Sequence, residues 1–254
     1  MEFEVINNNK NLCLIFIHGI GCNSNQFRYQ IDHFSKEYDI INVQLPGHGS
    51  NGQNNKGHDI LELAIEIYNF IKNINNKFVI VAHSIGVRIQ LQLYTLVENK
   101  TIGLILIDCT YNKINHLDPR ESICNIYCSD YVNFVTKIYN ERLEDCTQKV
   151  KKEVFKSLWN TNEDSFKYLY QSYLFYDYYS IEHVIKSIKV PILLLQTSFY
   201  KNGIKCDPIE SDYINLFRSL DNVNLEVFEN VSHWIMLQQP KKVNKNIIDF
   251  LNVL

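Results

Sequence analysis

Short apolar runs separated by amphipathic stretches are the feature that most constrains the fold of this 254-residue chain. Runs that are apolar on both faces are typical of parallel strands buried between layers of helices. Val223–Phe228 is a sixth, more polar candidate strand, and Phe3–Ile6 is expected at an edge. The five uncharged runs are Leu12–Ile17, Ile40–Val43, Phe78–Val81, Ile102–Ile107 and Ile192–Leu195.

Helical periodicity fills the intervals between these runs. Apolar residues recur every three or four positions from Ile60 to Ile74, from Ile209 to Leu220 and from Val243 to Leu254. Asp59 with Glu62 three residues later resembles a capping box. Alternating strands and helices predict an α/β fold with a mainly parallel central sheet flanked by helices.

Residues 111–187 break this alternation. They contain no strand-like run, are helical in pattern, and include 15 aromatic residues among 77. We therefore expect a core of residues 1–110 and 188–254, with a helical cap of residues 111–187 inserted before the penultimate strands. An insertion at the carboxyl end of a strand covers the crevice where ligands bind. Most of its aromatic side chains should pack the insertion onto the core, and a few should line a pocket.

Charge and composition argue against several classes of protein. The chain has 25 Lys and Arg against 28 Asp and Glu, a net charge of −3, which argues against a nucleic-acid-binding surface. No uncharged apolar run reaches the roughly 18 residues of a membrane span, and Met1–Glu4 lacks a signal-peptide pattern. Seven irregularly spaced cysteines indicate free thiols and a cytoplasmic protein. Cys124 and Cys128 could share a helix face, but two further metal ligands are missing.

Ser84 is the leading candidate nucleophile. It follows the buried Phe78–Val81 run directly and precedes an amphipathic segment, so it lies at a tight turn from strand to helix. Ala82 and Gly86 supply small residues two positions before and after it, close to the G-x-S-x-G pattern. Alone, the motif is weak, and the alternative is that Ser84 only caps a helix.

Two further segments support the catalytic interpretation. His18 and Gly19 follow the first buried run, where a glycine turn can point a backbone N–H at a substrate oxygen. The N–H groups of Ile20 and Ile85 would then form an oxyanion hole. His233 lies just after the last predicted strand and is the candidate general base.

The acid of the predicted triad has two candidates. Asp207 follows the Ile192–Leu195 run and lies 26 residues before His233. Asp108 ends the preceding run and is the rival, although it is equally well explained as a structural carboxylate. We favour Asp207, and the choice depends on the path of the chain between these two positions.

Together these segments resemble the α/β-hydrolase family, of the cap-bearing esterase and C–C hydrolase type, over nearly the whole chain. The chain departs from the family pattern at Ala82, Val87 and Gln44, and its segment from Pro191 to Asp207 is about seven residues longer than usual. The resemblance is carried by His18-Gly19, Leu45–Ser50, Ala82–Gly86, Lys189–Ile192, Asp207–Ile209 and Ser232–Trp234.

The predicted function is a serine hydrolase with a Ser84, His233 and Asp207 triad that cleaves a small carboxylic ester or thioester through an acyl-enzyme. The expected partner is a small-molecule acyl substrate, with no cofactor, metal, nucleic acid or membrane insertion. The alternatives are a C–C bond hydrolase with the same triad and a non-catalytic receptor that retains the pocket. The sequence does not indicate an oligomeric state.

Overall fold

A seven-stranded sheet forms the centre of the computed structural model, which describes residues 1–52, 57–109, 130–201 and 204–254. The strand order is β1-β3-β2-β4-β5-β6-β9, in which β1 is antiparallel to β3 and the other neighbours are parallel. The predicted α/β sheet is thereby confirmed, with the N-terminal strand at one edge. The strands are Glu2–Ile6 (β1), Leu12–Ile17 (β2), Asp39–Gln44 (β3), Lys77–His83 (β4), Thr101–Ile107 (β5), Ile192–Gln196 (β6) and Val223–Val227 (β9).

Burial of the strands explains their composition. The central strands β2 to β6 are buried almost throughout, because helices cover both faces of the sheet. Side chains on either face of a central strand therefore leave water, and an uninterrupted apolar run is favourable. The edge strands β1 and β9 are more exposed and carry glutamate and asparagine.

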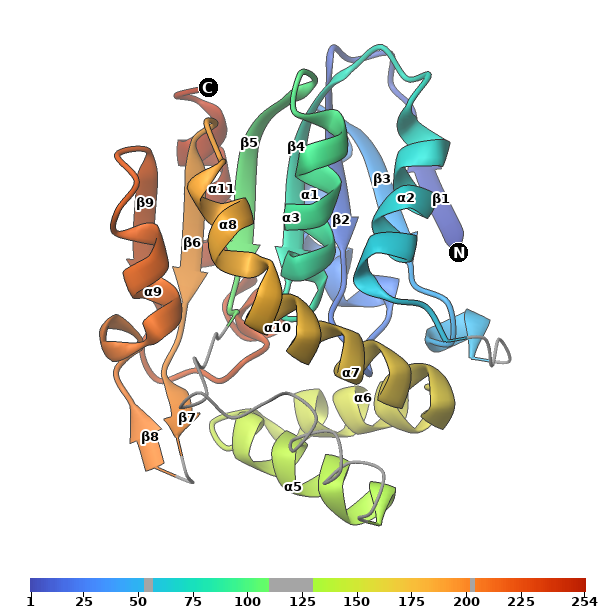
Figure 1. Cartoon of the computed structure of the whole chain (residues 1–254), viewed down its shortest axis with the longest axis vertical. Coiled ribbons are helices and arrows are strands. Elements are labelled where there is room, and N and C mark those ends of the chain that lie inside the picture. The colour runs from blue at the N-terminus through green and yellow to red at the C-terminus, as the bar shows by residue number, and fades with distance from the viewer. Residues whose placement is uncertain (53–56, 110–129, 202–203) are drawn as a thin grey trace.

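Two groups of helices flank the sheet (Figure 1). Helices α2, α3 and α8 lie in front of it, and α1 and α11 contact each other on the opposite side. The predicted capping box is confirmed at the start of α2, where Asp59 accepts the Glu62 N–H and Glu62 accepts the Asp59 N–H. These helices span Arg28–Phe34 (α1), Ile60–Ile71 (α2), Gly86–Val97 (α3), Ile181–Lys186 (α8), Asp212–Phe217 (α9), Ile235–Gln238 (α10) and Pro240–Leu251 (α11).

A helical insert lies between β5 and β6. Its helices α5 (Tyr131–Arg142), α6 (Gln148–Trp159) and α7 (Glu163–Tyr179) lie beneath the carboxyl ends of the strands in Figure 1. Aromatic rings join them, for example Phe134 and Tyr170, whose centroids are 5.6 Å apart. The start of the predicted insertion, with Cys124 and Cys128, lies outside the described residues. Among the described helices, none is long and apolar enough to cross a membrane.

Candidate active site

Ser84 lies at the turn from β4 to α3 and has a positive φ of 57°. Such a backbone conformation is costly for a residue with a side chain and is concentrated at functional sites. A Cβ on Gly86 would lie 2.6 Å from the carbonyl oxygens of Ile17 and His18. The small residue that the motif has at Gly86 is thus explained by the close approach of the chain at the end of β2.

The structure joins Ser84 to His233 and Asp108 by consecutive hydrogen bonds. His233 Nε2 lies 2.8 Å from Ser84 Oγ, and His233 Nδ1 lies 2.5 Å from Asp108 Oδ2. Because the carboxylate can only accept, Nδ1 carries the proton, and Nε2 is left to accept from the serine hydroxyl. The second oxygen of Asp108 accepts the Thr197 N–H at 2.8 Å, so both sides of the carboxylate are used.

The prediction that Asp207 pairs with His233 is wrong. Asp207 is exposed and caps a short 3-10 helix, Pro208–Glu210, by accepting the Ile209 N–H at 2.8 Å. The physical reason is the extra length before it, which forms a two-stranded antiparallel hairpin of β7 (Phe199–Lys201) and β8 (Ile204–Cys206). Asp207 lies beyond this hairpin, and the rival Asp108 occupies the acid position beside the imidazole.

Burial sets the charge state of this chain of residues. It raises the pKa of Asp108 to about 7. The hydrogen bond from the Thr197 N–H acts in the opposite direction, because it stabilises the ionised carboxylate. Burial lowers the pKa of His233 well below its usual value, and the Arg142 and Arg88 guanidinium groups lower it further. The imidazole is therefore neutral at rest, as a general base must be.

Two backbone N–H groups converge beside Ser84. Ile85 opens α3, and Ile20 follows Gly19 after β2; both line the same cavity as the serine. Within the part of the chain that the structure describes, neither N–H has a hydrogen-bond acceptor. Gly19 is required here, because a Cβ at that position would lie 2.9 Å from Ser84 Cβ. The arrangement can bind an oxyanion.

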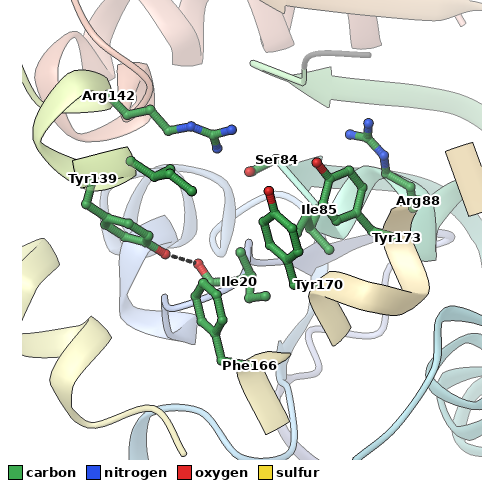
Figure 2. Close-up of a pocket in the computed structure, with 10 residues that line it drawn as sticks. Ile20, Ser84, Ile85, Arg88, Tyr139, Arg142, Phe166, Tyr170 and Tyr173 are labelled. Carbon is green, nitrogen blue, oxygen red and sulfur yellow. Dashed lines mark hydrogen bonds between the residues drawn. The ribbon is translucent and has the colours of Figure 1, made fainter. Parts of the chain in front are cut away.

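His18 and Tyr139 hold the loop that carries Ile20. His18 Nδ1–H donates to the Gly19 carbonyl at 2.8 Å, and its Nε2 accepts the Leu45 N–H at 3.1 Å. Burial lowers the pKa of His18 to about 3, so the ring stays neutral. Tyr139 of the insert donates its hydroxyl to the Ile20 carbonyl at 2.7 Å (Figure 2).

His83 is next to the serine in sequence but is not positioned as its general base. Its Nε2 donates to the His233 carbonyl at 2.9 Å, and its ring lies 4.5 Å from the His233 ring. Burial holds its pKa well below the usual value. The position of the base beside the serine hydroxyl is occupied by His233.

Sequence reasoning missed two arginines of the cavity. Arg88 donates to both carboxylate oxygens of the buried Asp177, which ties α3 to α7. It is the one charged residue in the amphipathic segment after Ser84, and this could have identified it. Arg142 ends α5, and nothing in the charged surrounding sequence distinguishes it. Figure 2 shows the two guanidinium groups on opposite sides of Ser84.

Comparisons with known proteins agree with this geometry. The model of the alpha/beta hydrolase family matches residues 14–246. A curated protein of Haemophilus influenzae, described as a putative esterase/lipase, is 25% identical over 253 residues, covering 94% of this chain and 83% of the relative.

Two solved structures share the fold. One is a thermophilic esterase from Thermogutta terrifontis, with a TM-score of 0.80 and 14% identity, over 99% of this chain and 92% of that one. The other is an enol-lactonase from Burkholderia xenovorans, with a TM-score of 0.75 and 13% identity, over 99% of this chain and 96% of that one.

Proposed function

Because the chain belongs to the alpha/beta hydrolase family, we propose that it is a serine hydrolase that cleaves carboxylic esters or thioesters through an acyl-enzyme. The observation that carries this proposal is the hydrogen-bonded series from Ser84 through His233 to Asp108. A serine hydroxyl is a weak nucleophile until an adjacent base removes its proton. The relative from Haemophilus influenzae, described as a putative esterase/lipase, supports the ester bond as the target.

Each described group has a role in this reaction. Ser84 Oγ attacks the substrate carbonyl while His233 Nε2 takes its proton, and Asp108 stabilises the resulting imidazolium. The N–H groups of Ile20 and Ile85 bind the oxygen that becomes negative, each worth roughly 3–4 kcal/mol of barrier. His233 then returns the proton to the leaving group and activates a water that hydrolyses the acyl-enzyme. The chemistry requires no cofactor.

The insert forms the second wall of the site in this proposal. Residues 1–110 and 188–254 form the catalytic core, and residues 111–187 form the cap. Phe166, Tyr170 and Tyr173 line the same cavity as Ser84, which is suited to a small acyl substrate. All the cysteines among the described residues are free thiols, which supports a reducing compartment such as the cytosol.

Covalent labelling tests the proposal. We expect a fluorophosphonate probe to label the wild-type protein, and Ser84→Ala to abolish both labelling and hydrolysis of nitrophenyl esters and acyl thioesters. Ser219→Ala is the matched control, because Ser219 is exposed and donates its hydroxyl to the nearby Leu216 carbonyl. Turnover that persists in Ser84→Ala would contradict the assignment. An unlabelled protein that hydrolyses no ester would favour a binding protein.

A further inference from the structure

Arg142 is held against the proposed general base. It is the last residue of α5, and its carbonyl accepts the His233 N–H at 3.3 Å. Its Nη1 lies 3.4 Å from His233 Nε2, and Figure 2 shows its guanidinium pointing toward the Ser84 hydroxyl. The side chain lines the cavity that contains Ser84 and also the adjoining cavity of 220 Å³ that contains His233.

Arg142 forms no ion pair with a carboxylate in the described parts of the chain. The other cations of the two cavities differ in this respect. Arg88 pairs with Asp177, and Lys205 pairs with Asp145. A guanidinium left without a partner in a cavity is a site for an anion that arrives with the ligand.

The position of Arg142 is unfavourable for catalysis while it has no anion. Its N–H groups compete with the Ser84 hydroxyl for the lone pair of His233 Nε2. Its charge also opposes the positive charge that His233 acquires when it takes the serine proton. An anion bound to Arg142 would remove both effects at once, since it would engage the N–H groups and neutralise the charge.

We propose, building on the function proposed above, that the substrate carries a carboxylate close to the scissile ester and that Arg142 binds this carboxylate. The planar fork of a guanidinium matches a carboxylate through two parallel hydrogen bonds. A single charge is favoured over a doubly charged phosphate, because Asp108, Glu141 and Asp145 line the same cavity. The preferred substrates are then monoesters of dicarboxylic acids, or esters whose leaving group carries the acid.

Matched ester pairs test this inference in the wild-type protein. The first set comprises 4-nitrophenyl monoesters of glutaric, adipic and suberic acids, each compared with its methyl-capped counterpart. The second pair is 4-acetoxybenzoate and its methyl ester, which place the charge on the leaving group. For at least one distance between the carboxylate and the ester, we expect kcat/KM for the acid to exceed that for the capped ester about tenfold or more. A hydrogen-bonded contact between a guanidinium and a carboxylate has an effect of this size.

Variants of Arg142 assign the preference to this side chain. Arg142→Gln should abolish the preference for the acid over the capped ester, and Arg142→Lys should retain part of it, because the charge remains but the planar fork is lost. Lys189→Gln is the control for net charge, since Lys189 is exposed and pairs with Glu98. The Lys189→Gln protein should prefer the acid over the capped ester as strongly as the wild type does.

The outcomes separate this inference from the proposed function. The carboxylate site alone would be overturned if a protein that is labelled at Ser84 hydrolysed the charged and the capped esters at equal rates. This result would have to hold for every acyl length and also for the pair with the charge on the leaving group. A preference that survives Arg142→Gln would overturn the carboxylate site as well. If no ester is cleaved, the proposed function fails, and binding of monomethyl adipate still tests the carboxylate site. In a thermal-shift assay, monomethyl adipate, which carries one carboxylate, should raise the Tm of the wild type and not of Arg142→Gln, and dimethyl adipate should raise neither.

Discussion

Asp108 can orient the imidazole only as a carboxylate. It accepts the Thr197 N–H with one oxygen and the His233 Nδ1–H with the other. In Asp108→Asn the amide NH₂ would face Nδ1, and the ring proton would move to Nε2, where it prevents deprotonation of Ser84. We expect kcat on an ester to fall about 10⁴-fold, as for loss of the orienting acid in such triads.

Asp207→Asn is the matched control for this change. Asparagine caps helices as well as aspartate does, so the contact with the Ile209 N–H should persist. We expect kcat and Tm close to those of the wild type. A large loss of kcat in Asp207→Asn, with normal turnover in Asp108→Asn, would restore the acid to the position favoured by the sequence.

The contrast between these two aspartates shows what local sequence can predict in such a site. Ser84 and His233 are recognisable because the strand, the turn and the small residues lie next to them in the chain. Asp108 and Asp207 both follow buried strands, so local pattern cannot separate them. The choice depends on the β7–β8 pair between them, whose pairing is a tertiary feature that the apolar pattern does not reveal.

At the level of elements, α5 is joined to the loop after β2 by one hydroxyl. Tyr139 is buried, donates to the Ile20 carbonyl at 2.7 Å and packs on Gly21, whose φ is 64°. We infer that this contact positions the Ile20 N–H for the oxyanion. Tyr139→Phe should lower kcat about fivefold to tenfold, the equivalent of one hydrogen bond, with little change in KM.

Tyr179→Phe controls for loss of a tyrosine hydroxyl, because Tyr179 is exposed on α7. Steady-state kinetics on one ester gives kcat and KM, and thermal melting reports stability. A purely structural Tyr139 would instead lower Tm and leave kcat of the folded protein unchanged. That result would remove Tyr139 from the positioning of the oxyanion loop.

The elements themselves were largely predictable, and their contacts were not. Buried strands and amphipathic helices leave a period in the sequence that local reasoning can find. The period identifies the apolar face of a helix but not the side chains that meet across it. The Arg88–Asp177 pair joins residues 89 positions apart, and the contact of Tyr139 with Ile20 joins residues 119 apart. Only the tertiary structure brings such pairs together.

In the whole molecule, the site forms where the carboxyl ends of parallel strands meet the insert. Ser84 follows β4, Asp108 follows β5, Thr197 follows β6 and His233 lies beyond β9. Adjacent parallel strands bring these ends to one edge of the sheet, as is general for open α/β folds. Helices α5 and α7 then cover that edge, and α5 adds Arg142 to the cavity that contains Ser84.

The same concentration of groups under the insert buries several titratable side chains. Burial lowers the pKa of His18 to about 3 and of His48 to about 4. It lowers those of His83 and His233 well below their usual value, and it raises that of Asp108 to about 7. Near pH 5, the unfolded chain would therefore bind a proton on His18 and on His48 that the folded protein does not, while the folded protein keeps one on Asp108.

Acid should consequently destabilise the whole fold. The four histidines make stability fall as the pH drops below about 6.5, and Asp108 opposes them with one proton. His18 and His48 together outweigh Asp108 by about one proton near pH 5, and His83 and His233 act in the same direction. The free energy of unfolding should therefore fall by at least about 1.4 kcal/mol per pH unit near pH 5. Urea denaturation between pH 7 and pH 4.5 measures this slope. His48→Asn should reduce it by about one proton, whereas His33→Asn, at an exposed position, should not. A stability independent of pH from 6.5 to 5 would show that these histidines are protonated in the folded protein.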